Sequence, residues 1–84
     1  MAQTSKLKHK FGGIEVIVKE NIRAARIEAN LDMNEASRAL GFSRKILEDN
    51  EAIRNYGCHV KLNLLAAMAE LYDKPIEYFF AENE

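Results

Sequence analysis

The sequence predicts a small all-α domain, on three observations. Apolar residues recur at spacings of three and four along most of the 84-residue chain, which is the period of helices that bury one face. Helix start and stop signals, such as Asp32 and Gly41, stand between the periodic segments. The chain holds one proline and four glycines, so little of it is obliged to be loop. We therefore expect one compact domain of five helices.

The first thirteen residues are basic and precede a Gly12–Gly13 pair. Their cationic and titratable side chains are Lys6, Lys8, His9 and Lys10. We expect residues 1–13 to form a basic, flexible N-terminal arm and residues 14–84 to form the folded domain. The simplest interpretation of this arm is a solvated tail, because chain ends are often poorly ordered. The alternative is an arm that lies along phosphates or reaches into a minor groove.

The segment from 14 to 29 is expected to be the first helix. Its apolar positions fall on one helical face and are Ile14, Val18, Ile22, Ala25 and Ala29. The β-branched stretch IEVIV alone could pass for a strand. The period continues beyond it, however, which favours a helix. Asn30 can end this helix, since asparagine tolerates the left-handed conformation.

The next two helices are predicted to be short and joined by a tight turn. Asp32 has the features of an N-cap, and Glu35 can complete a capping box with it. Gly41 stops this helix because glycine adopts positive φ at no steric cost. Ser43 can cap the following helix, which reads RKILEDNE. The core contacts expected from this helix and the residues just after it are Ile46, Leu47 and Ile53.

The last third of the chain predicts a connector and two further helices. Residues 54–61 form the connector, with Gly57 as a helix breaker. Residues 62–72 carry a broad apolar face at helical spacing. Pro75 can open a short final helix, since proline is accepted in a first helical turn.

Composition excludes several classes of function. The net charge of −1 means that nucleic-acid binding would need a local basic patch. Cys58 is the single cysteine, so neither an internal disulfide nor a cysteine-based zinc cluster can form within one chain. The adjacent Cys58 and His59 are too few for a metal site and badly placed for catalysis. We expect no enzyme activity, no catalytic residues, no metal and no cofactor.

The sequence also predicts a cytoplasmic protein. No segment approaches the roughly 20 apolar residues that span a bilayer, so no membrane partner is expected. The basic N-terminus lacks the apolar core of a secretion signal. The absence of disulfides is in keeping with a reducing compartment.

Taken in order, these segments resemble the lambda-repressor-like helix-turn-helix proteins of the Cro and cI type, also called XRE regulators. The resemblance covers roughly Val18 to Phe80. NIRAARIEANL is similar to the family's first helix, DMNEASRALGFSRKILEDNE to its helix-turn-helix, and LAAMAELYDKPIEYFF to its closing helix pair. The resemblance implies a compact five-helix lambda-repressor-like domain. It also implies a prokaryotic or phage-like transcription regulator, most simply a repressor, which binds double-stranded operator DNA as a homodimer.

The resemblance assigns candidate site residues. The DNA-facing positions that it implies are Met33, Ser43, Arg44, Lys45 and Asp49. In this family the region before the fourth helix often contacts phosphate. Here that region offers Arg54, Asn55, Tyr56 and Lys61. Among these, Arg44 is suited to bond guanine bidentately, and Lys45 can bond the same base edge or a phosphate. The family also commonly pairs a first-helix arginine with a glutamate at the end of the recognition helix, which implies a structural salt bridge between Arg26 and Glu51.

Some features depart from the family pattern and leave a second function open. The recognition helix is acidic, with Glu48 and Asp49 besides the structural glutamate. Met33 stands where a glutamine is common, and Asn50 stands where an apolar residue is usual. The alternative is a degenerate helix-turn-helix that binds proteins, an antirepressor or assembly factor, and does not bind DNA.

Overall fold

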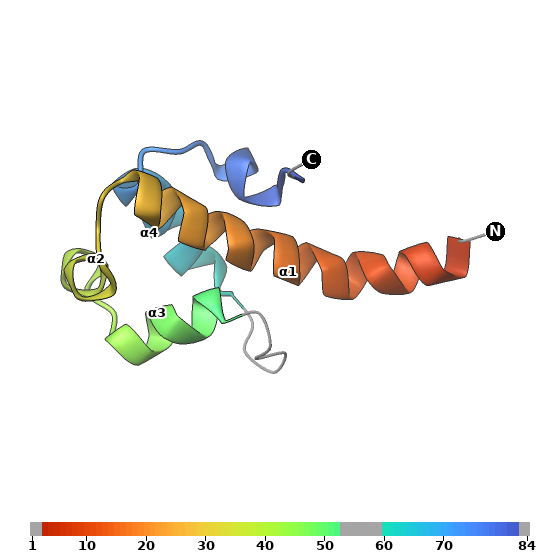
Figure 1. Cartoon of the computed structure of the whole chain (residues 1–84), viewed down its shortest axis with the longest axis horizontal. Coiled ribbons are helices and arrows are strands. Elements are labelled where there is room, and N and C mark those ends of the chain that lie inside the picture. The colour runs from red at the N-terminus through yellow and green to blue at the C-terminus, as the bar shows by residue number, and fades with distance from the viewer. Residues whose placement is uncertain (1–2, 53–59, 83–84) are drawn as a thin grey trace.

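One long helix, α1 (Gln3–Glu28), organises the fold, and the other elements gather on its C-terminal half (Figure 1). The computed structural model describes residues 3–52 and 60–82, with backbone alone for 3–12. The remaining helices in these ranges are α2 (Met33–Leu40), α3 (Arg44–Glu51), α4 (Leu62–Leu71) and the 3₁₀ helix η1 (Ile76–Phe80). α3 and η1 contact α1 directly, while α2 packs on α3 and α4.

The all-helical prediction is confirmed for the described residues, which contain no strand. The predicted count of five α-helices is not confirmed, because the last element is a short 3₁₀ helix. Pro75 precedes this helix with an extended backbone, and five residues suit the tighter 3₁₀ geometry, which seldom runs long. None of the described helices is both long enough and apolar enough to cross a membrane.

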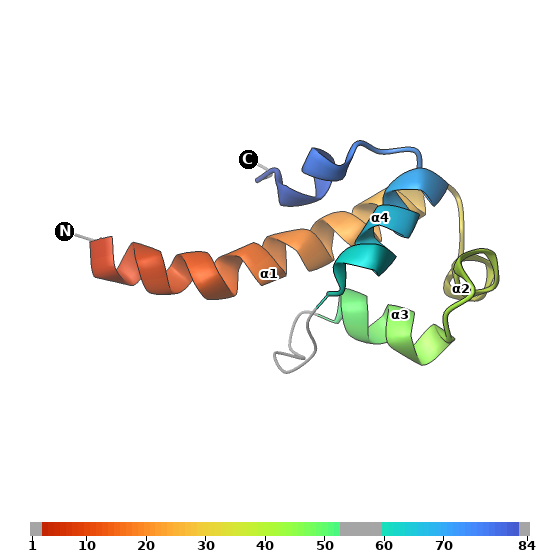
Figure 2. The same ribbon diagram turned by 180° about the vertical axis from the view of Figure 1, so that it is seen from behind.

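The N-terminal half of α1 projects beyond the other helices, as both views show (Figures 1 and 2). The Cα radius of gyration is 13.2 Å, against about 12 Å for a compact chain of this length. The backbone of residues 3–13 is helical and continues without a break into Ile14, where we expected a flexible arm. Glycine inside a helix costs only about 1 kcal/mol relative to alanine, so the glycine pair need not end the helix.

The core lies where α1, α3, α4 and η1 meet. Its fully buried side chains include Ile22, Ala25, Leu47, Met68 and Phe79. The expectation that Ile46 joins Leu47 in the core is wrong, since the Ile46 side chain is 40% exposed. Neighbouring residues on a helix point about 100° apart, so a short helix packed on one side buries one of the two. Ile53 lies outside the described residues.

Loop residues end the helices as the sequence indicates. Asn30 adopts a φ of 61° just after α1, which is the left-handed conformation expected of it. Asp73 does the same after α4, with a φ of 58°. Asn21 on α1 then secures the end of the chain, because its buried side-chain amide donates to the carbonyls of Phe79 and Ala81 at 2.9 and 2.8 Å.

Candidate nucleic-acid interface

Local hydrogen bonds fix the geometry of α2 and of the turn that follows it. The Asp32 carboxylate accepts from the Glu35 backbone N–H at 2.7 Å, and the Glu35 carboxylate accepts from the Asp32 N–H at 2.9 Å. This is the capping box predicted from the sequence. At the other end, Gly41 adopts a φ of 75° and its N–H donates to the Ser37 carbonyl at 2.9 Å. Ser43 then opens α3 by accepting from the Ile46 N–H at 3.2 Å.

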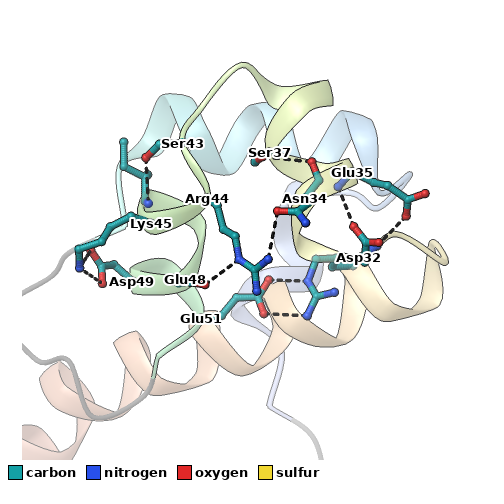
Figure 3. A network of polar contacts seen from close by, with 12 residues as sticks. Asp32, Asn34, Glu35, Ser37, Ser43, Arg44, Lys45, Glu48, Asp49 and Glu51 are labelled. Carbon is teal, nitrogen blue, oxygen red and sulfur yellow. Dashed lines mark hydrogen bonds and ion pairs between the residues drawn. The ribbon is translucent and has the colours of Figure 1, made fainter.

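A buried ion pair holds the C-terminal end of α3 against α1. Arg26 donates through Nε and Nη2 to the two carboxylate oxygens of Glu51, at 2.8 and 3.1 Å (Figure 3). Its Nη1 donates to the Leu31 carbonyl at 2.8 Å. The two side chains are 12% and 5% exposed. The Glu51 hydrogen bond raises the pKa of Arg26 above its ordinary value. The structure thus places these residues in the pairing that the resemblance implies, and Glu51 turns away from the outer face of α3.

Lys19 secures the same end of α3 and was not singled out from the sequence. Its side chain is 1% exposed, and its Nζ donates to the carbonyls of Asp49 and Ala52 at 3.1 and 3.2 Å. Carbonyls at a helix C-terminus lack partners within the helix, and a cation there also complements the helix dipole. By helical register Lys19 lies beside the apolar arc of α1 rather than within it, so the sequence carries no signal of this buried role.

The outer face of α3 carries the two candidate base-reading cations, and each is paired with an acid one turn later (Figure 3). Arg44 Nε donates to Glu48 at 2.7 Å, and Arg44 Nη1 donates to the Asn34 side-chain oxygen at 3.1 Å. Lys45 Nζ lies 3.4 Å from an Asp49 carboxylate oxygen. The Arg44 and Lys45 side chains are 53% and 79% exposed. Both cations are therefore accessible, yet neither stands as an isolated positive charge.

This pairing changes the electrostatic expectation for the site. With Glu51 neutralised by Arg26, two cations and two acids remain on α3, and they pair one to one. The local basic patch that DNA binding would need is thus balanced by carboxylates in the free protein. Exposed pairs of this i,i+4 kind contribute about 0.3–0.5 kcal/mol each, so a stronger partner can displace them.

The other candidate residues are distributed unevenly around this face. Met33 is half-buried and packs against the core, and the Ser43 hydroxyl is used in capping α3. Lys61 is exposed at the start of α4. Asn34, which was missed from the sequence, lies beside Arg44 and orients it. The candidates outside the described residues are Arg54, Asn55 and Tyr56, together with Cys58 and His59.

Comparison with known proteins yields no match. No family model matches the chain, and neither a curated protein nor a solved structure does so. The lambda-repressor-like assignment therefore stays a prediction from the sequence. The case for a function rests on the geometry of α2 and α3.

Proposed function

We propose that this protein is a sequence-specific DNA-binding transcription regulator, most simply a repressor, which binds operator DNA as a homodimer. The observation that carries the proposal is the outward position of Arg44 and Lys45 on the first turn of α3. The C-terminal end of this helix is fastened to α1 through Lys19 and Arg26. A helix that is fixed at one end and bears cations on its outer face is suited to a major groove. The proposal includes no catalytic activity.

The energetics favour exchange of partners when DNA arrives. Arg44 would leave Glu48, at a cost of about 0.3–0.5 kcal/mol. A bidentate contact to guanine contributes about 1–3 kcal/mol of discrimination, so the exchange is favourable. The carboxylates of Glu48 and Asp49 then lie near phosphates, which lowers affinity. They also penalise sites that fail to supply the matching bases, so part of the affinity is exchanged for selectivity.

Dimerisation supplies the remaining affinity in this proposal. A single module of this size buries a modest area on DNA, whereas two modules read two half-sites at once. The half-sites are expected about 34 Å apart, which is one helical turn of the duplex, or a multiple of that distance.

Duplex binding at low salt tests the proposal. The wild type should bind generic duplex at about 50 mM salt, since phosphate contacts give measurable non-specific binding there. Arg44→Ala and Lys45→Ala should each weaken binding. Lys74→Ala is the matched control, because it removes the same charge from the loop between α4 and η1, on the side of α1 away from α3 (Figure 1). Absence of duplex binding by the wild type, or equal losses in all three variants, would refute the proposal.

The balanced charge of α3 favours one competing function, the protein-interaction module. A double variant, Glu48→Gln with Asp49→Asn, separates the two. It frees both cations and removes two negative charges from the surface that faces phosphates. A DNA-binding protein should therefore bind duplex more tightly after this change. A chain that still ignores duplex at about 50 mM salt after the double change supports the interaction module instead.

A further inference from the structure

An apolar groove opens where α1 leaves the rest of the fold. It is lined by Ile14 and Val18 of α1, by Leu62 and Leu65 of α4, and by Phe80 of η1. Three of these side chains are markedly exposed: Leu62 at 77%, Phe80 at 48% and Ile14 at 43%. Contiguous exposed apolar residues mark interaction sites on soluble domains.

We propose that this groove receives the N-terminal half of α1 from a second copy of the chain, and that the two α1 helices cross antiparallel near Gly13. This inference rests on the homodimer of the proposed function and identifies its interface. Such a pairing is isologous, since each copy offers both a groove and a projecting helix. Three features of the molecule support a second copy as the occupant.

The first feature is the projecting half of α1 itself (Figures 1 and 2). Short helical segments without tertiary packing are marginal in water, so residues 3–13 need a surface to pack on. By helical register, Leu7 and Phe11 lie seven and three residues before Ile14. They continue its apolar stripe away from the groove, on the same helical face. In an antiparallel crossing, this stripe reaches the groove of the other copy.

The second feature is complementary charge. The sequence of residues 1–14 contains the basic residues Lys6, Lys8 and Lys10 and no acidic residue. The groove is lined in part by Glu15, and two further acids are exposed: Glu77 of η1 and Glu82, which follows that helix. An antiparallel pair brings the basic segment of each copy to the acidic rim of the other. Opposite charges of this kind steer association and fix the register of an interface.

The third feature is the spacing that the crossing gives to the two α3 helices. With a rise of 1.5 Å per residue, Lys19 lies about 9 Å along the axis from Gly13, and Arg26 lies about 20 Å from it. Both residues hold the C-terminal end of α3. Two-fold symmetry doubles these values, so the α3 attachments of the two copies lie about 18–39 Å apart along the axis. This range includes the roughly 34 Å between half-sites one turn apart.

Analytical ultracentrifugation of the full chain, without DNA, tests the interface. The wild type should form a dimer, and Leu62→Glu should raise its dissociation constant by about tenfold or more, because it replaces an apolar side chain of the groove by a charge that the second copy would have to bury. The substitution lies in the first turn of α4, where an acid suits the helix dipole, so the monomer should fold normally. Ile27→Glu is the matched control. Ile27 is also an exposed apolar residue of α1 but lies outside the groove, so this variant should dimerise like the wild type.

A monomeric wild type, or a dimer whose dissociation constant is the same in Leu62→Glu as in the wild type, would overturn the inference.

The two proposals fail in distinguishable ways. A chain that dimerises through the groove but ignores duplex keeps this interface and refutes DNA binding. A chain whose duplex binding depends on Arg44 but which stays monomeric keeps DNA binding and refutes this interface.

Discussion

Replacing Glu51 by alanine should remove a large part of the stability of the fold. The Arg26 side chain is only 12% exposed, and the substitution removes the carboxylate that accepts two of its hydrogen bonds. Removing one partner of a buried ion pair costs about 3–5 kcal/mol. The total stability of a chain of 84 residues is about 4–13 kcal/mol, so the loss is between a quarter and all of it. A loss of 3 kcal/mol corresponds to a fall in Tm of at least about 12 °C.

Urea unfolding followed by circular dichroism measures this loss, with Glu48→Ala as the matched control. Glu48 also accepts from an arginine, but at the surface, so its removal should cost about 0.3–0.5 kcal/mol. A loss in Glu51→Ala of less than about 1 kcal/mol would place the Arg26 pair among exposed ones and refute the reasoning. The double variant Arg26→Met with Glu51→Leu should recover part of the loss, because it leaves no unpaired buried charge.

Substitutions at three further positions test other parts of the fold. Lys19→Met should lower the free energy of unfolding by about 1–3 kcal/mol, because it leaves two carbonyls at the end of α3 without their donor. Amide hydrogen exchange in the last turn of α3, followed by NMR, should become faster. Gly41→Ala should lower the free energy of unfolding by about 1–2 kcal/mol, measured by thermal unfolding. The loss comes from backbone conformation alone, since φ is 75° and an added Cβ meets no atom within 4 Å. Gly41→Asn should lose less, because asparagine tolerates this conformation. Burial, with a smaller effect of Glu51, raises the pKa of Tyr72 from 10.0 to about 12. The unfolded chain therefore loses this proton first, stability should fall as pH rises from 10 towards 12, and Tyr72→Phe should flatten that fall in urea midpoints.

The parts of the fold that local chemistry determines could be predicted from the sequence. The cap at Asp32, the turn at Gly41 and the cap at Ser43 each depend on a few adjacent residues, and all three are present in the structure. The left-handed Asn30 is of the same kind. The Arg26–Glu51 pairing required the resemblance, because 25 residues separate its members and spacing alone does not relate them.

The parts that depend on tertiary packing could not be predicted. Lys19 is an ordinary surface residue until α3 brings its terminal carbonyls to it. The partial exposure of Ile46 depends on which side of α3 meets α1, and the apolar pattern of a short helix leaves that choice open. The i,i+4 spacing of Arg44 and Glu48 allows these residues to pair, but the balance of charge on α3 also depends on the removal of Glu51 from its outer face, which packing against α1 determines.

The attachment of α3 to α1 also bears on how the chain folds. An eight-residue helix is too short to persist alone in water. α3 receives its C-terminal hydrogen bonds from Lys19, 30 and 33 residues away, so this closure requires a docked α1. The segment from 31 to 52 is therefore not an autonomous folding unit. Folding of the helix-turn-helix is coupled to folding of the first helix, and a peptide of that segment alone should remain largely unstructured.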